Sequence, residues 1–189
     1  MNIVKSACLA TILAVPAATA NAAVIYATSV DSYTQGTTTR ITGFDPMRAV
    51  TANALGAPDG KMLSLGFGGE AILSFGTVFT GPGNIVEITF VNAITGALAY
   101  LEEVQVFLGV GGVFSYLTNL KNTTAVTGAP FAFSGTFDQI KLVDVSPTGR
   151  SRDGFDIDSV SVTAIPVPAA GLLLLSAIGG FAMLRRRTA

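Results

Sequence analysis

Four aspartates are the residues of this chain whose type and spacing could bind a metal ion. Three gather near the end of the acidic part of the sequence and one lies in an early Pro-Asp-Gly turn: Asp153, Asp156, Asp158 and Asp59. If the first and last strands of a β-domain pair, these two regions come together. Calcium takes roughly six to eight oxygen ligands from carboxylates and backbone carbonyls, so one interpretation is a structural calcium site. The alternative is turn chemistry, in which each aspartate accepts hydrogen bonds from nearby backbone N–H groups.

Adjacent acids at Glu102 and Glu103 are a second candidate, as a pair for glycosidic cleavage. Neighbouring residues on a strand point to opposite faces, so these two cannot flank one bond, and we expect both to be solvated. The chain has no histidine, which excludes a Ser-His-Asp or Cys-His site and a histidine metal site. We therefore expect no catalytic residue, and a secreted hydrolase is the least favoured function.

Charge is distributed unevenly along the 189 residues. All 12 acidic residues but only seven of the 11 basic residues lie between positions 23 and 164, so that stretch has a net charge of −5. An acidic domain argues against nucleic acid as a partner, because phosphates require a basic surface. Half of all residues are hydrophobic, and the excess is concentrated at the two ends of the chain.

Residues 1–22 have the pattern of a secretory signal peptide. Lys5 precedes an apolar run at 7–15 that is too short to span a bilayer. A small-x-small cleavage site follows, so we expect passage through the Sec translocon and cutting by signal peptidase; its residues are Ala20, Ala22 and Ala23, the predicted first residue of the mature chain. The alternative is an uncleaved anchor helix.

Residues 165–189 have the pattern of a C-terminal membrane-sorting signal. Prolines in its first part prevent a helix and leave an extended peptide that a processing enzyme can reach; the predicted motif is Pro166, Val167, Pro168, Ala169 and Ala170. The apolar stretch at 169–184 is short for a membrane span, but snorkelling arginines can compensate. A basic cluster that should stay cytoplasmic follows it, namely Arg185, Arg186 and Arg187. The alternative is a plain tail anchor.

This three-part tail resembles the PEP-CTERM class of sorting signals of Gram-negative bacteria, in the variant called VPLPA-CTERM. The chain has Ile-Pro-Val-Pro-Ala from Ile165, so two conservative changes leave the proline spacing intact. The resemblance implies cleavage by an exosortase-type membrane protease. The protein would be tethered transiently in the inner membrane and then delivered to the cell surface or the extracellular matrix.

Residues 23–164 have the pattern of an all-β domain, with little helical periodicity. Short β-prone runs are separated by turns rich in Gly, Pro, Asn and Asp; they lie at 71–75, 85–91, 103–108, 131–133, 139–145 and 160–162. Many short strands at this spacing predict an antiparallel β-sandwich. Asp156 and Asp158 share a strand face with Val160 and Val162, so the last strand must change its burial pattern or bury an aspartate.

Most of this domain resembles a group of secreted bacterial domains with a galactose-binding-like, or discoidin-like, fold. The matching segments are Leu-Gly-Ala-Pro-Asp-Gly from Leu55, Ser-Leu-Gly-Phe-Gly-Gly from Ser64, and Asp-Ile-Asp-Ser-Val from Asp156. The group often has an acidic residue after its third strand, where this chain has Asn92. The resemblance implies an antiparallel jelly-roll β-sandwich, which the two end segments would flank with a signal helix and a transmembrane helix.

These patterns predict an exported, non-enzymatic protein with a structural or adhesive role at the cell surface. The alternative is a carbohydrate-binding module for exopolysaccharide, in which exposed tyrosines on a concave face stack on sugar; the candidates are Tyr26, Tyr33, Tyr100 and Tyr116. Aromatic residues of a sandwich more often belong to the core or to strand pairs. The sequence therefore leaves the activity of the domain open.

Overall fold

The computed structural model describes residues 23–38, 46–91, 93–124, 127–149 and 151–165. Across these residues the regular structure consists of nine β-strands and one short 3-10 helix, Thr51–Ala54. All strand pairings among them are antiparallel, which confirms the predicted all-β class. The strands are β1 Val24–Tyr26, β2 Ser29–Thr34, β3 Leu63–Ser64, β4 Glu70–Glu87, β5 Glu103–Val110, β6 Val113–Lys121, β7 Ala129–Phe131, β8 Phe137–Asp144 and β9 Asp156–Ala164.

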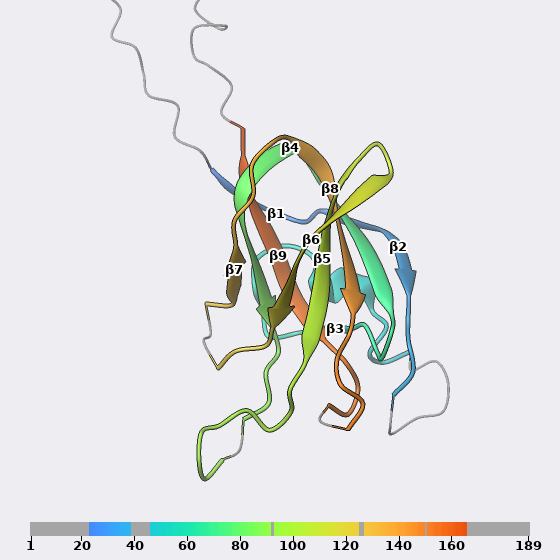
Figure 1. Ribbon diagram of the computed structural model, residues 1–189, viewed down its shortest axis with the longest axis vertical. Helices are drawn as coiled ribbons and strands as arrows, with labels where there is room; N and C mark the ends of the chain where they lie inside the picture. Colours follow the sequence, from blue (N-terminus) through green and yellow to red (C-terminus); the bar gives the residue numbers. More distant parts are fainter. Residues whose placement is uncertain (1–22, 39–45, 92, 125–126, 150, 166–189) are drawn as a thin grey trace, which may run out of the picture. The chain divides into compact units, whose positions relative to one another are not determined.

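The long strand β4 takes part in two sheet layers (Figure 1). Its first part, residues 70–74, pairs with β8 and β2. Its second part, residues 79–87, pairs with β9, and residues 83–85 also pair with β7. One layer therefore has the order β2-β4-β8-β5-β6, and in the other β9 lies between β4 and the short strands β1 and β3. The two layers form a β-sandwich.

β4 passes from one layer to the other around Gly76. The φ angle of Gly76 is +70°, in a region that residues with a Cβ rarely adopt. The register with β8 is interrupted between Ser74 and Phe79, and at Phe79 the strand pairs with both β8 and β9. Phe79 is fully buried at this crossing, where its ring meets that of Phe75 edge to face at 4.7 Å between centroids.

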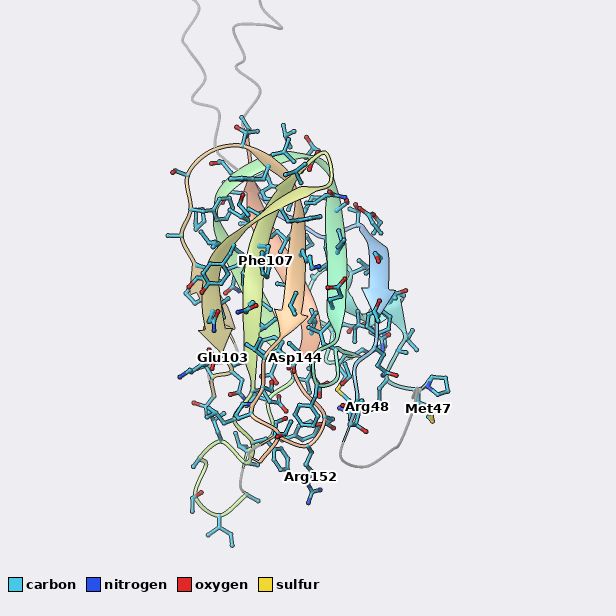
Figure 2. All side chains as sticks on the ribbon, turned by 45° about the vertical axis from the view of Figure 1, so that its right-hand side comes forward. Met47, Arg48, Glu103, Phe107, Asp144 and Arg152 are labelled. Carbon is cyan, nitrogen blue, oxygen red and sulfur yellow. The ribbon has the colours of Figure 1, made fainter. Side chains whose placement is uncertain are left out.

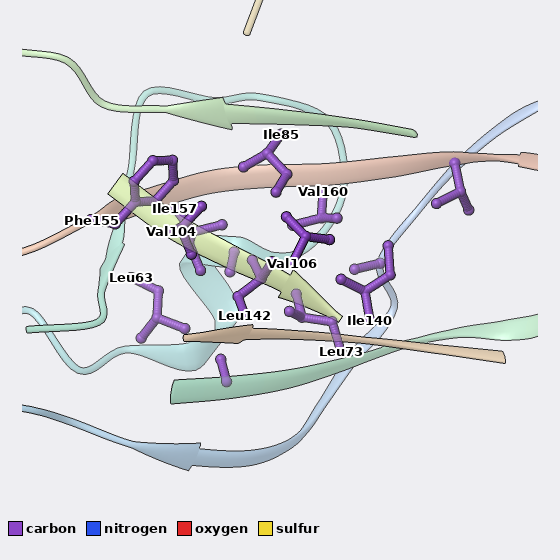
Figure 3. Close-up of a cluster of buried hydrophobic side chains, with 14 of the residues drawn as sticks. Leu63, Leu73, Ile85, Val104, Val106, Ile140, Leu142, Phe155, Ile157 and Val160 are labelled. Atoms are coloured by element: carbon purple, nitrogen blue, oxygen red, sulfur yellow. The ribbon is translucent and has the colours of Figure 1, made fainter. Parts of the chain in front are cut away.

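The core lies between the layers and is built from alternate residues of the strands that face it (Figure 3). Val104, Val106 and Leu108 of β5 are buried, and the alternate residues Gln105 and Phe107 are half-buried, which is the period-two pattern of a strand with one apolar face. The other strands that line the core supply further fully buried side chains, including Leu73, Ile85, Ile140, Leu142, Ile157 and Val160.

β9 changes its burial pattern at Asp158. Ile157 and Val160 both belong to the core although they are three residues apart. The register with β4 shifts at this point, because Val86 pairs with Ser159 and Glu87 with Ile157. A β-bulge thus adds one residue to β9. The sequence required either such a change or a buried aspartate, and the structure has both, since Asp156 and Asp158 are buried.

Some strand limits predicted from the sequence are wrong. The run at 85–91 is a strand only as far as Glu87, and the segment that pairs with β4 is β7 at 129–131 rather than 131–133. The sequence pattern also does not predict β6. This edge strand pairs with β5, and its side chains are exposed or half-buried throughout, so it lacks a clear apolar face.

The predicted signal peptide and sorting tail lie outside the described residues, except for Ala23 and Ile165. This applies to Ala20, Ala22, the motif at 166–170 and the arginines at 185–187. No helix in the part of the chain that the structure describes is long and apolar enough to cross a membrane. The two flanking helices therefore stay predictions.

Two isoleucine-to-alanine substitutions in the full chain should separate core from surface. Ile157→Ala empties a fully buried site (0% exposed) and should lower the free energy of unfolding by about 2–5 kcal/mol. Ile94→Ala, at a position that is 94% exposed, should change it by less than about 0.5 kcal/mol. Urea titration followed by circular dichroism measures both, and equal effects would contradict the sandwich core.

Candidate functional site

Two loops that cross between the layers meet at one end of the sandwich, drawn at the bottom of Figure 1. Residues 88–102 run from the end of β4 to β5, and residues 145–155 run from the end of β8 back to β9. The strands at which the two loops start are paired with the strands at which they end. Glu87 of β4 pairs with Ile157 of β9, and Val104 of β5 pairs with Asp144 of β8. The topology therefore brings the loops together, and we call this region the loop end.

Arg48 ties a third loop to this region through two ion pairs. Its guanidinium binds the Asp153 carboxylate and, through Nη2 at 2.8 Å, Oδ2 of Asp156. Both aspartates are buried and Arg48 is mostly buried. Burial raises the pKa of Asp156 to about 7, although the Arg48 charge acts against it. The contacts join the segment before the 3-10 helix, the β8–β9 loop and the first residue of β9.

A buried glutamate, Glu102, lies beneath the two crossing loops beside the half-buried Glu87. Glu102 is 1% exposed, and its carboxyl group hydrogen-bonds that of Glu87. The Ser151 hydroxyl donates to Oε1 of Glu102 at 2.9 Å. Burial, together with the bond to Glu87 and its charge, raises the pKa of Glu102 to about 9, and burial also raises the pKa of Glu87. The raised pKa keeps a proton on Glu102 at neutral pH.

The expectation that Glu102 is solvated is wrong. Glu102 lies just before β5 rather than on it, and only Glu103 begins the strand. Glu103 is half-exposed and accepts a hydrogen bond from Asn119 Nδ2 at 2.7 Å. The partner of Glu102 is therefore Glu87, at the end of another strand. Glu102 is thus coupled to an acid of another segment rather than to its neighbour Glu103.

Asp144, at the end of β8, is a buried centre of hydrogen bonds that the sequence analysis missed (Figure 2). Its carboxylate accepts from the Ser146 hydroxyl at 2.6 Å, from Phe155 N at 2.9 Å and from Gly68 N at 3.2 Å. Burial raises its pKa, and these hydrogen bonds counteract that. Gly68 belongs to the Ser-Leu-Gly-Phe-Gly-Gly segment, so Asp144 joins that turn to both sides of the β8–β9 loop. In the sequence, the only indication of this role is the position of the aspartate at the end of a predicted strand.

The four aspartates considered for calcium have other partners. The Asp158 carboxylate accepts hydrogen bonds from the backbone N–H groups of Asp59, at 3.0 Å, and Gly60, at 3.2 Å. Asp59 pairs with Lys61 at 2.6 Å, while Asp153 and Asp156 pair with Arg48. Within the described ranges no group of three or more acidic, histidine or cysteine side chains is placed to hold a metal ion. Only Asp59 shows the local turn contact, because its carboxylate accepts a hydrogen bond from Lys61 N at 3.0 Å. Calcium binding stays a prediction.

Two adjoining hollows open at the loop end and share two residues, Tyr100 and Arg152. The Arg152 guanidinium lies 5.2 Å from the centre of the Tyr100 ring, within the range of a cation–π contact. The large hollow, of about 490 Å³, lies between the crossing loops and is lined by Leu98, Ala99, Tyr100, Leu101, Gly149, Ser151 and Arg152. The small hollow, of about 110 Å³, is lined by Arg48, Phe90, Tyr100, Arg152 and Asp153.

The lining of these hollows suits a small polar ligand. Aromatic rings offer an apolar face, and a guanidinium offers a planar fork of N–H donors. Ser151 and Asp153 also line the hollows, but both are buried, and they contact Glu102 and Arg48 respectively. A few convergent polar groups in a concave setting are the usual features of a ligand site. Arg152 projects outward at the loop end, whereas Arg48 lies closer to the strands (Figure 2).

The other tyrosines considered for stacking lie elsewhere. Tyr33 is half-buried on β2 and donates its hydroxyl to Ser64 O at 2.6 Å. Tyr116 packs edge to face on Phe107 in the β5–β6 pair, with centroids 5.6 Å apart. Tyr26 lies on β1, which pairs with β9. Tyr100 alone among the four lines the hollows described above.

No protein-family model matches the chain, and no curated protein matches it. Among solved structures it is similar to the family 32 CBM of C. perfringens NanJ in complex with galactose, with 14% identity over 52% of this chain and 68% of that chain and a TM-score of 0.39. It is also similar to the C-terminal domain of a chitobiase from Bacteroides fragilis, with 14% identity over 74% of this chain and 94% of that chain and a TM-score of 0.48. The assignment of the fold class therefore rests on the strand pairing itself.

The stability of the domain should fall as pH rises. An acid whose pKa is raised by folding keeps its proton in the folded state, so folding takes up protons between the two pKa values. For Glu102 this window runs from 4.5 to about 9, and for Asp156 it runs from 3.8 to about 7. The free energy of unfolding of the full chain, from urea titrations at successive pH values, should decrease across this range.

Two glutamine variants test the origin of this decrease. Glu102→Gln removes the titrating group but keeps a hydrogen-bond donor toward Glu87, so the decline above pH 7 should become shallower. Glu103→Gln changes the adjacent acid, which lies outside the buried pair, and should leave the decline as it is. The same slope above pH 7 in the Glu102 variant and the unchanged chain would show that Glu102 does not hold the proton.

Proposed function

We propose that this chain is an exported, non-enzymatic β-sandwich protein that binds carbohydrate at its loop end. One observation carries the proposal, namely the two adjoining hollows built around the stacked pair of Tyr100 and Arg152. A sugar ring has an apolar C–H face and a rim of hydroxyl groups. An aromatic ring and a guanidinium in one site complement both features.

The frame beneath the hollows supports a binding site whose geometry is set before the ligand arrives. Ser151 is held by Glu102 at 2.9 Å, and Asp153 is held by Arg48. Asn122 donates to the backbone carbonyl of Tyr100 at 3.0 Å. Residues flanking or lining the hollows are thus fixed by buried contacts, and such support reduces the entropic cost of binding.

The site favours binding over catalysis. Glycosidic cleavage needs two carboxyl groups separated by the bond they act on. Glu87 and Glu102 instead bond each other below the surface, and Asp153 is engaged by Arg48. The proposal therefore assigns the loop end a recognition role.

We further propose that the sandwich is a jelly roll displayed at the cell surface or in the extracellular matrix, with exopolysaccharide as its ligand. The sequence supports export through the signal at residues 1–22 and sorting through the tail at 165–189. A purely structural or adhesive role, the other function that the sequence predicts, needs no hollow. A protein that is displayed at the cell surface but binds no glycan would favour that role.

Two tyrosine-to-alanine variants test the site. Tyr100→Ala removes the ring shared by both hollows and should weaken glycan binding by about tenfold or more, since a well-placed aromatic contact contributes of this order. Tyr116→Ala removes a ring that is 56% exposed on β6 and should leave binding unchanged. A glycan array followed by calorimetry on the full chain measures both, with galactose among the probes.

Equal binding by the two tyrosine variants would contradict the placement of the site. Thermal unfolding of each variant provides the control for folding, because both rings lie at the surface of the sandwich rather than in its core.

Mass spectrometry of the protein isolated from its own cells tests the proposed export. The mature chain should begin at Ala23, because Ala20-Asn21-Ala22 is a small-x-small cleavage site. Its C-terminus should lie before the arginines at 185–187, because the predicted protease removes the basic cluster. An intact chain of 189 residues recovered from the cytosol would contradict export.

A further inference from the structure

We propose that the end of the sandwich opposite the loop end holds a second binding site, one that takes a sugar with a free amino group. The site is a hollow of about 490 Å³ between the bend of β4 and the turn from β5 to β6, and we call it the turn hollow. This inference goes beyond the proposed function, because this part of the domain is separate from the loop end. Together the two sites would give one domain two points of attachment to glycans.

Two bends of the backbone form the turn hollow, and both lie at the end of the sandwich drawn at the top of Figure 1. β4 bends at Gly76, and the β5–β6 turn has φ angles of +57° at Gly111 and +83° at Gly112. All three glycines line the hollow. A Cβ added at Gly111 or Gly112 would meet nothing within 4 Å, so a ligand can approach the backbone of the turn closely.

The hydrogen bonds around the turn hollow are donated to two aspartates and leave acceptors over. Nε2 of Gln139, at 2.8 Å, and the hydroxyl of Ser74 both donate to Oδ2 of Asp31. Gly111 N donates to the carboxylate of Asp138, at 3.2 Å from Oδ2 and 3.3 Å from Oδ1. Oε1 of Gln139 is buried and has no hydrogen-bond partner among the described residues. A ligand rich in donors therefore suits this lining better than one rich in acceptors.

The charge at the turn hollow is negative. The half-buried Asp138 lines the hollow, and the exposed Asp31 contacts two of its lining residues, Ser74 and Gln139. The hydrogen bond from Ser74 lowers the pKa of Asp31, although burial acts against it, so this carboxylate is ionised at neutral pH. None of the described residues that line the hollow is basic. The electrostatics therefore favour a cationic group such as an ammonium.

An amino sugar has the groups that this lining complements. Its ammonium group carries three N–H donors, and a carboxylate such as that of Asp138 can accept several hydrogen bonds. Its ring adds hydroxyl groups and an apolar C–H face. Thr77 and Val78 line the hollow and are exposed, Val78 to 48%, so they offer a hydroxyl and an apolar surface to such a ring. The volume of the hollow lies within the range of small-molecule sites.

Matched pairs of probes isolate the amino group. Chitosan oligosaccharides are compared with cello-oligosaccharides, which keep the linkage but have a hydroxyl in place of each amino group, and galactosamine is compared with galactose. NMR titration of the isotope-labelled full chain should show at least one amine binding about fivefold or more tightly than its counterpart, because its hydrogen bonds are charge-assisted. The amide signals of Gly76, Gly111 and Gly112 should shift most.

Charge-matched variants separate the turn hollow from general attraction. Residues 23–164 carry a net charge of −5, which attracts any cation. Asp138→Asn and Glu103→Gln each remove one negative charge, but Glu103 begins β5 and lies at its other end. Asp138→Asn keeps an oxygen that can accept from Gly111 N and should lower the affinity for the amine about threefold or more. Glu103→Gln should leave this affinity within about twofold.

A second pair of variants blocks the turn hollow without changing an aspartate. Thr77→Arg places a bulky cation at an exposed position of the lining and should abolish binding of the amine. Thr77→Ser keeps the hydroxyl and should bind the amine as the unchanged chain does.

The outcomes separate this inference from the proposed function. Equal affinity for the amine and its hydroxyl counterpart, or equal losses in the two charge variants, would overturn the inference and leave the loop end untouched. Loss of amine binding in Tyr100→Ala would place the amine at the loop end and overturn it as well. Spermidine, an amine without a sugar ring, should bind more weakly than the amino sugar, and equal binding that depends on Asp138 would overturn the sugar as ligand. The map of shifted amides uses the unchanged chain, so it holds even if a variant fails to fold.

Discussion

The buried ion pairs of Arg48 are the interaction on which the loop end depends. They connect a segment that precedes the 3-10 helix to the β8–β9 loop and to the first residue of β9. Loss of the arginine would leave Asp153 and Asp156 as buried charges, a change that typically costs about 3–5 kcal/mol. Arg152 and Ser151 lie next to Asp153 in the chain, so the positions of these lining residues follow from the contacts of Arg48.

The buried carboxyl groups fix the positions of the crossing loops more than they stabilise the fold. Replacing a buried ionic cluster by apolar residues of similar volume is often neutral or stabilising, so burial of Glu87, Glu102 and Asp156 does not by itself favour folding. The contacts of these groups are directional, however, so the Asp156 ion pair with Arg48 and the Ser151 hydrogen bond to Glu102 each favour one arrangement of the chain. The network thereby specifies how the two crossing loops lie over the end of the core.

Local patterns in the sequence predicted much of the frame and little of the site. The alternation in β5 and β8 and the turns between strands follow from residue types within a few positions. Asp158 and the Pro-Asp-Gly turn carry their own signals, and the structure joins them by hydrogen bonds. The pair of Glu87 and Glu102 has no such signal, because the two acids lie in different segments and meet only in the folded chain. In the sequence, Glu102 beside Glu103 has the pattern of two solvated acids. Only the fold shows that the end of β4 lies near Glu102.

The topology explains why the site lies where it does. β4 ends in the layer of β9 and the chain continues to β5 in the other layer, while β8 leads back from that layer to β9. Two crossings at the same end of a sandwich must lie side by side. Acids at the ends of strands, Glu87 and Asp144, then hold the loops, and two residues within the loops, the half-buried Tyr100 and the exposed Arg152, line the hollows. The strand ends set the frame, so substitutions confined to the loops can change the ligand without changing the fold.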